Sequence, residues 1–289
     1  MTLKHFQIFS EVCRFGSITK AAEYMNMAQP AVSHAIRELE SYYSARLFER
    51  MNRRIYITPA GEQLLAYADS ILGQFNETRD VLRDAGRFTK VRIGTNVSYG
   101  TGIFPGMVSA FSKEHPDIPL FFTVHNSGKI EESLLRNELD FGIIDYPNNP
   151  LYFHYMLIRE EEMAAVCTPE FEIPDTISME EIEGIPLLVR EKGSGSRNYV
   201  ERILSDYSIK PLIKMESVST QSLIEICKTG MGMLFLPLSL VKRQLEDGSL
   251  RKIKIIENKW ERKYYLVYHK SKYLTQSMKL FLQYVAGNK

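Results

Sequence analysis

The chain has 289 residues, of which 44% are apolar and 25% charged, the composition of a globular protein with about two domains. Its net charge is +1, but residues 1–58 carry eight Lys/Arg against five Asp/Glu. A basic surplus confined to this short part indicates a polyanionic partner there and not along the remainder of the chain.

Membrane and secretory classes are also disfavoured. The longest apolar run, residues 231–241, is too short to span a bilayer and contains a proline, and the first residues lack the apolar core of a signal peptide. The three cysteines, Cys13, Cys167 and Cys227, match no metal or redox spacing, which predicts thiols in a reducing compartment. We therefore predict a cytoplasmic protein.

The N-terminal part predicts three short helices. Residues 3–15 have one apolar face, Gly16 ends this helix, and Ser17 is a good N-cap for a second helix over residues 18–25. A third helix follows at residues 28–40 (AQPAVSHAIRELE) after a break of two residues. Two consecutive helices joined by so tight a turn predict a helix-turn-helix.

The third helix has one apolar face and one polar face. Its apolar residues Val32, Ile36 and Leu39 recur at helical spacing, so this face joins a core. The opposite face carries hydrogen-bonding groups and one cation: Gln29, Pro30, Ser33, His34 and Arg37. In a helix-turn-helix such residues meet base edges in the major groove, where Gln pairs with adenine and Arg with guanine. The alternative, a solvated helix face, explains single residues better than it explains the combination.

A basic hairpin follows, in which a tight turn (NRR) leads into a short strand (IYIT). This is the pattern of a wing beside a helix-turn-helix. Lys20, Arg53 and Arg54 are placed to hold phosphates, which fix register and contribute affinity but read little sequence.

A long helix begins at Thr58-Pro59, which supply an N-cap and a first-turn proline. One series of mostly apolar residues recurs along this helix at alternating spacings of four and three positions: Leu64, Ala68, Ile71, Phe75, Thr78 and Leu82. Such a repeat predicts a seam for a second helix and hence a homodimer. The alternative is an amphipathic helix packed on its own domain.

From residue 90 the pattern changes to alternating strands and helices. The predicted strands are residues 91–95, 119–124, 140–145, 185–189, 213–218, 233–237 and 263–269. This order predicts a parallel sheet with helices on both faces. Two such units in succession predict two subdomains with a cleft between them, subdomain I at about 90–161 and 266–289, and subdomain II at about 162–265.

Loops at the carboxyl ends of parallel strands are where such folds bind ligands. The residues predicted to line the cleft are Asn96, Ser98, Ser127, Ser194, Gly195, Ser196, Ser219 and Thr220. Hydroxyls and free N–H groups at helix N-termini favour an anion or the carboxylate of a zwitterion. Arg190 and Arg197 are candidate counter-ions. The alternative is that these serines and threonines only cap helices.

An enzyme is the competing class. GSGSR lacks the G-x-S-x-G spacing of a nucleophile elbow, and GTGIFPG is one residue off G-x-G-x-x-G without the acidic partner. The six histidines show no metal-ligand spacing. We therefore predict no catalytic residue, no metal site and no cofactor. A solute-binding or transferase-like protein could share residues 90–289 but would not need residues 1–60.

Three stretches of the N-terminal part strongly resemble the DNA-binding domain of LysR-type transcriptional regulators: GSITKAAEYMNMAQPAVSHAIRELE, LFER and ITPAGE. The resemblance spans residues 1 to about 65, with less specific matches beyond. One departure is Ala28, where many members have a Ser or Thr N-cap. The loss of this N-cap lowers the stability of the helix by about 1 kcal/mol locally.

The resemblance implies an N-terminal all-α winged helix-turn-helix over residues 1–58 and a linker dimerisation helix over residues 59–89. It implies an α/β effector-binding domain like a periplasmic binding protein, with two subdomains, over residues 90–289. The expected function is sequence-specific transcription regulation controlled by a small effector bound between the subdomains. The expected partners are double-stranded promoter or operator DNA, an anionic or zwitterionic metabolite, RNA polymerase, and further copies of the chain in a homodimer or tetramer.

Overall fold

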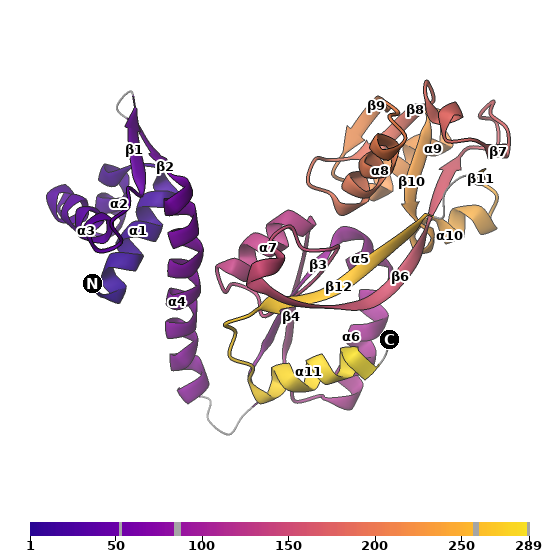
Figure 1. The fold of residues 1–289 in the computed structure, drawn as a ribbon. Helices are drawn as coiled ribbons and strands as arrows, with labels where there is room; N and C mark the ends of the chain where they lie inside the picture. The colour runs from indigo at the N-terminus through magenta and orange to yellow at the C-terminus, as the bar shows by residue number, and fades with distance from the viewer. Residues whose placement is uncertain (52–53, 84–87, 257–259, 288–289) are drawn as a thin grey trace.

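The computed structural model describes residues 1–51, 54–83, 88–256 and 260–287. Its N-terminal domain consists of three helices and a two-stranded antiparallel hairpin, followed by a long helix (Figure 1). These elements are α1 (Leu3–Phe15), α2 (Ile18–Tyr24), α3 (Gln29–Tyr42), β1 (Phe48–Met51), β2 (Arg54–Ile57) and α4 (Pro59–Arg83). In the part of the chain so described, no helix combines the length and apolarity needed to cross a bilayer.

Local hydrogen bonds set the ends of these helices as predicted. Ser17 Oγ accepts a hydrogen bond from the Lys20 backbone N–H at 3.3 Å, which caps α2. Thr58 Oγ1 likewise accepts from the Gly61 N–H at 3.0 Å at the start of α4. Ala28 gives α3 no side-chain cap, as its residue type requires. The turn signals in the sequence therefore identify where α2 and α4 begin, whereas α3 continues to Tyr42, two residues beyond its predicted end.

Gly16 ends α1 in the left-handed conformation, with φ of 58°. Gly16→Ala should lower the free energy of unfolding by about 1 kcal/mol, because only the backbone strain changes. No atom lies within 4 Å of the added Cβ, and the same holds at Gly106 inside helix α6 (Phe104–Glu114). Gly106→Ala is the matched control and should raise the free energy of unfolding by up to about 1 kcal/mol. Urea unfolding of both variants measures this, and a shift of the same sign in both would contradict the explanation.

The first half of helix α4 packs against the N-terminal domain of the same chain. Leu64 and Ala68 are buried in the core of the N-terminal domain, in which α4 packs against α1. These two residues are covered within one chain, so their assignment to a seam with a partner helix is corrected. Ile71, Phe75 and Leu82 are exposed by 39%, 56% and 71%. The free apolar stripe is therefore shorter than the periodicity indicated.

The rest of the chain forms two α/β units joined by two long strands (Figure 1). Subdomain I contains β3 (Val91–Asn96), α5 (Val97–Gly102), α6 (Phe104–Glu114), β4 (Leu120–His125), α7 (Ser127–Leu135), β5 (Phe141–Ile144) and α11 (Gln276–Gly287). Subdomain II contains β7 (Thr176–Ile177), β8 (Pro186–Arg190), α8 (Gly195–Asp206), β9 (Leu212–Ser217), α9 (Thr220–Lys228), β10 (Met233–Pro237), α10 (Leu238–Glu246) and β11 (Arg251–Ile255). Two short 3-10 helices lie at Pro150–Tyr152 and Glu180–Ile182.

The two long strands are β6 (Phe153–Cys167) and β12 (Glu261–His269), and they pair antiparallel to each other. The strand order is β4-β3-β5-β12-β6-β10-β8-β9, in which β3, β4 and β5 are parallel, as are β10, β8 and β9. The prediction of a wholly parallel sheet is therefore wrong, because the connection between subdomains is made by antiparallel strands. The sequence pattern missed β6 altogether.

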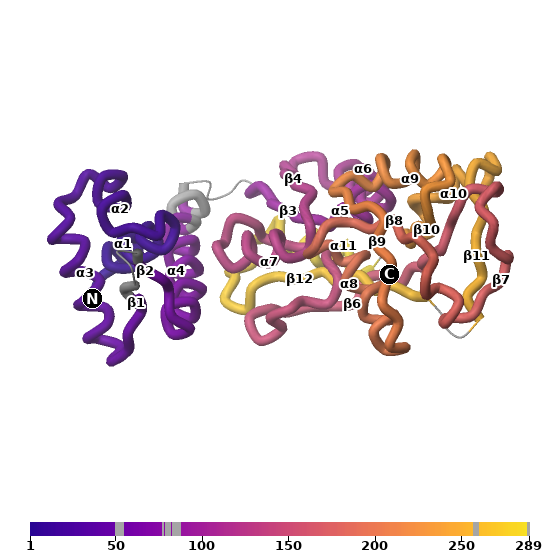
Figure 2. Tube along the Cα trace, turned by 90° about the horizontal axis from the view of Figure 1, so that it is seen from above, coloured from indigo at the N-terminus to yellow at the C-terminus, as the bar shows by residue number. Residues whose placement is uncertain are grey.

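Each subdomain has its own apolar cores on the two faces of its sheet. The view in Figure 2 places the N-terminal domain at one end of the molecule, with α4 between it and subdomain I. Contact between α4 and α7 includes an ion pair of Asp69 with Arg136 at 3.7 Å. The carboxyl ends of the parallel strands and the crossing strands β6 and β12 together position the cleft described below.

Candidate functional site

The polar face of α3 is open to solvent. Gln29, Pro30, His34 and Arg37 are exposed and Ser33 is half-buried, whereas the opposite face of α3 is buried in the core of the N-terminal domain. Figures 1 and 2 both show α3 on the side of this domain away from α4. A rigid helix thus presents these side chains at one edge of the molecule.

The polar side chains of this face contact one another, the backbone of α3 and, through Glu38, His5 of α1. Gln29 Nε2 donates to Ser33 Oγ at 2.8 Å, and Arg37 Nε reaches the Ser33 carbonyl at 3.4 Å. His34 Nδ1 lies 3.2 Å from a Glu38 carboxylate oxygen, which is also 2.9 Å from His5 Nε2. The hydrogen bond from His5, with a smaller contribution from His34, lowers the pKa of Glu38. A carboxylate therefore limits the positive potential around His34, while Arg37 remains the exposed cation of this face.

The predicted phosphate-binding residues are described only in part. Lys20 is exposed on α2. Arg53 lies outside the described residues, and of Arg54 only the backbone, in β2, is described.

A cavity of about 690 Å³ lies between the two subdomains. Its lining includes side chains of both charge signs and several aromatic rings. The polar lining comprises Ser127, Asp145, Asn148, Asn198, Arg202, Glu261, Arg262 and Lys263, and the ring groups include Tyr146 and Tyr265. Of the residues predicted from sequence, Ser127 and Gly195 line this cavity directly.

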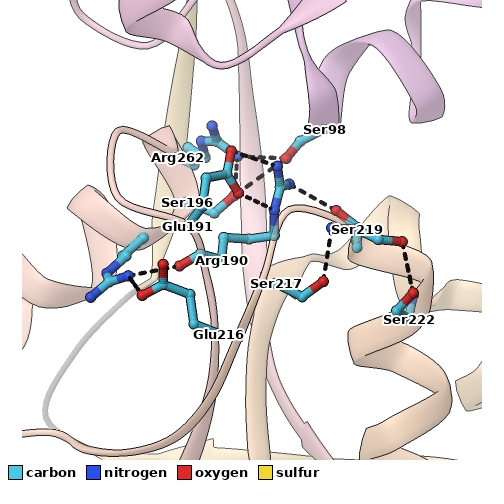
Figure 3. Close-up of polar contacts among 11 residues, drawn as sticks. Ser98, Arg190, Glu191, Ser196, Glu216, Ser217, Ser219, Ser222 and Arg262 are labelled. Atoms are coloured by element: carbon cyan, nitrogen blue, oxygen red, sulfur yellow. Dashed lines mark hydrogen bonds and ion pairs between the residues drawn. The ribbon is translucent and has the colours of Figure 1, made fainter.

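Arg262 is the centre of a hydrogen-bond network in the cleft (Figure 3). This side chain extends from β12, is 2% exposed, and donates through Nη1 to Ser98 Oγ at 2.9 Å and to Ser196 Oγ at 2.8 Å. The two serine oxygens are 3.3 Å apart although they belong to different subdomains. Two of the predicted effector residues therefore lie close together, but both accept hydrogen bonds from an arginine that the prediction did not include.

Asp145 provides the counter-charge of Arg262. Its Oδ1 lies 2.6 Å from Arg262 Nε and its Oδ2 lies 3.0 Å from Arg262 Nη2. Burial alone would lower the pKa of Arg262, but the Asp145 carboxylate reverses this and raises it above the ordinary value. Ser127 Oγ also donates to Asp145 Oδ2, at 2.9 Å. The geometry is the two-point arrangement typical of strong charge-assisted pairs.

Other predicted cleft residues have structural roles. Asn96 and Ser219 cap α5 and α9 through bonds of 2.9 Å and 3.2 Å to backbone N–H groups, and Ser194 is buried at the N-cap position of α8. Thr220 Oγ1 accepts from Arg190 at 2.8 Å. Asn96, Ser219 and Thr220 make these bonds and are not among the residues that line the cavity, so their role in effector binding stays a prediction.

The two candidate counter-ions are likewise engaged within subdomain II. Arg190 pairs with Glu191 at 2.9 Å (Figure 3). Arg197 pairs with Glu201 at 2.7 Å and with Glu216 at 2.5 Å. Both guanidinium groups are buried. Both guanidinium groups thus already have carboxylate partners within the chain, and their role as counter-ions of a ligand stays a prediction.

Asp145 and Arg262 are the main residues that sequence reasoning missed. Asp145 directly follows β5, so the strand-end rule that selected Asn96 and Ser127 would have selected it too. The predicted strand, residues 140–145, instead ended on Asp145, so Asp145 was counted as a strand residue and not as part of a cleft loop. Arg262 offered no such signal, because it lies at the start of a crossing strand and its partner is 117 residues away.

Comparisons with known proteins cover almost the whole chain. Residues 3–62 match the family described as bacterial regulatory helix-turn-helix protein, lysR family, and residues 85–288 match the LysR substrate binding domain. The transcriptional activator CmpR of Synechocystis is 27% identical over 288 residues, covering 98% of this chain and 94% of CmpR.

Two solved structures share the fold. Full-length CbnR complexed with its target DNA is 18% identical with a TM-score of 0.58, covering 100% of this chain and 99% of CbnR. The regulatory domain of Synechocystis CcmR in complex with 2-PG is 20% identical with a TM-score of 0.64, covering 70% of this chain and 98% of that domain.

Proposed function

Because the chain belongs to the LysR family of bacterial transcriptional regulators, we propose that it reads operator DNA through the exposed face of α3. The observation that carries this proposal is the division of α3 into a buried apolar face and an open polar face with Gln29, Ser33 and Arg37. Bidentate contacts from Gln and Arg to base edges each discriminate by about 1–3 kcal/mol. CbnR, which has the same fold, is solved with its target DNA.

A mobility-shift assay with duplex DNA from the region upstream of the protein's own gene tests this proposal. Saturable binding that survives excess unrelated duplex is the expected result. Binding should weaken steeply as salt rises, because cationic side chains displace counterions from the phosphates. No shift at low salt on upstream or unrelated DNA would contradict the proposed role of α3.

Dimerisation through α4 is the second part of the proposal. Ile71, Phe75 and Leu82 stay exposed on this helix after the chain has folded, and their spacing continues one apolar stripe. Two recognition helices on spaced half-sites require such a pair of chains. The shortened stripe leaves fewer contacts than the sequence pattern indicated, so single substitutions there should have large effects.

Phe75→Glu should weaken the dimer at least tenfold in Kd. Burying a phenylalanine at the seam contributes about 1.5–3 kcal/mol, and the introduced carboxylate adds a desolvation cost. Sedimentation velocity over a concentration series measures the change. Val218→Glu, which replaces another apolar residue exposed by 71%, is the matched control and should leave association unchanged. A Phe75→Glu protein that dimerises like wild type would remove this stripe from the interface.

We further propose that a small zwitterionic or anionic metabolite binds in the cavity between the subdomains. The cavity combines a buried cation, a carboxylate, amides and tyrosine rings, as a site for a polar metabolite requires. In CcmR, the regulatory domain binds 2-PG. An effector here would touch both subdomains and the crossing strand β12, and would thereby favour one relative orientation by the difference in its affinity for the two. Coupling of this kind is typically 1–3 kcal/mol.

A thermal-shift screen of the full-length protein against carboxylates, amino acids and sulfur compounds identifies the ligand class. Hits should then alter the mobility shift of the same DNA. A ligand that stabilises the protein but leaves DNA binding and DNA bending unchanged would contradict the coupling.

A further inference from the structure

The carboxylate of Asp145 lies against Gly195, the first residue of α8. Asp145 Oδ2 lies so close to Gly195 that a Cβ added there would be 1.5 Å from this oxygen. The same carboxylate is held by Arg262 through Nε and Nη2 and by the Ser127 hydroxyl. Glycine at position 195 is therefore required for the close approach of Asp145 in subdomain I to α8 in subdomain II.

The surroundings of this carboxylate have the parts of a complete anion-binding site. The N-terminus of a twelve-residue helix carries a partial positive charge, and Arg262 adds a full one that is shielded from solvent. Ser98 and Ser196 hold the remaining guanidinium nitrogen of Arg262 in place. Asp145 is 22% exposed and lines the cavity, so its position is reachable from the cleft.

We propose that Asp145 is a built-in carboxylate ligand that fills this site and excludes free carboxylates from it. This inference rests on the proposed role of the cavity as the effector site. It specifies that an effector bearing a carboxylate places that group elsewhere in the cavity, while the end nearest α8 offers it a hydrogen-bond acceptor. Asp145 is thus a residue that determines ligand specificity, and removing its carboxylate converts this end of the cleft into a receptor for small anions.

Formate is the probe, because it reproduces the missing carboxylate with no further group. Full-length Asp145→Ala is heated in formate and in chloride at equal ionic strength. The expected result is a saturable rise of Tm by about 2–4 °C with formate relative to chloride. Wild-type protein should show no such difference, because the site is filled. Asp145→Ser replaces Asp145→Ala in the same series if the alanine variant does not fold.

Gly195→Ala provides the second arm, because its Cβ takes the place of the carboxylate oxygen. Combined with Asp145→Ala it should abolish the response to formate. In the wild-type background it should lower Tm, and this loss should be smaller once Asp145 is absent. The proposal is overturned if formate has no effect on the Asp145 variants, if it stabilises wild type equally, or if the double variant responds as strongly. None of these readouts involves DNA or the natural effector, so their failure is distinct from failure of the proposed function.

Discussion

Asp145→Ala is expected to lower the free energy of unfolding by about 3–5 kcal/mol, the range observed when one partner of a buried ion pair is removed. The variant leaves Arg262 almost wholly buried, with two serine hydroxyls and the Tyr264 ring as its contacts, and without the carboxylate that contributes most to its charge balance. The reverse variant, Arg262→Met, should cost less, about 1–3 kcal/mol. Its remaining carboxylate is 22% exposed and keeps the hydrogen bond from Ser127. The two substitutions differ in their effect on stability because the Asp145 carboxylate that remains in Arg262→Met has access to water, whereas the Arg262 guanidinium that remains in Asp145→Ala has almost none.

Urea unfolding followed by tryptophan fluorescence measures this difference. Trp260 is the only tryptophan of the chain, is 7% exposed, and packs in a core of subdomain II two residues from Arg262. The double variant Asp145→Ala/Arg262→Met removes both charges and should be more stable than Asp145→Ala alone. If Arg262→Met proves the more damaging substitution, the guanidinium contributes through its packing and its serine contacts more than through its charge.

Features set by residues close in sequence could be predicted well. Ser17 and Thr58 bond to N–H groups three residues further on, so a short sequence window contains both partners. The apolar face of α3 follows from its helical spacing for the same reason. Periodicity also located the apolar face of α4, but it could not say what covers that face. For Leu64 and Ala68 the cover is the chain's own N-terminal domain.

Strand β6 shows why the connection between subdomains was missed. Its middle, Arg159–Glu162, is charged and interrupts any apolar alternation that would predict a strand. The strand persists because β12 supplies cross-strand partners, such as Lys263 for Glu160 at 2.9 Å. The partners lie about a hundred residues apart, and the same crossing strand brings Arg262 to Asp145. The cleft could be placed from strand ends, whereas its central ion pair depends on non-local pairing.

Arg37→Ala is expected to weaken binding to the specific operator by about 1–3 kcal/mol, or roughly fivefold to 150-fold. Binding to unrelated duplex should change much less, because a base contact contributes to sequence selection and a phosphate contact does not. Arg37 is exposed, and its one described hydrogen bond, to the Ser33 carbonyl, is long at 3.4 Å. The substitution should therefore leave the fold and the thermal unfolding of the protein unchanged.

Lys20→Ala is the matched control, since it removes an exposed cation from the neighbouring helix α2. It should weaken binding by a similar factor on every duplex and reduce the salt dependence of log K by about one. Fluorescence anisotropy with operator and scrambled duplexes over a salt series separates the two patterns. If Arg37→Ala lowers affinity equally for both duplexes, Arg37 contacts phosphate alone. Selection between sequences would then depend on Gln29 and Ser33, whose side chains hydrogen-bond to each other at 2.8 Å in the absence of DNA.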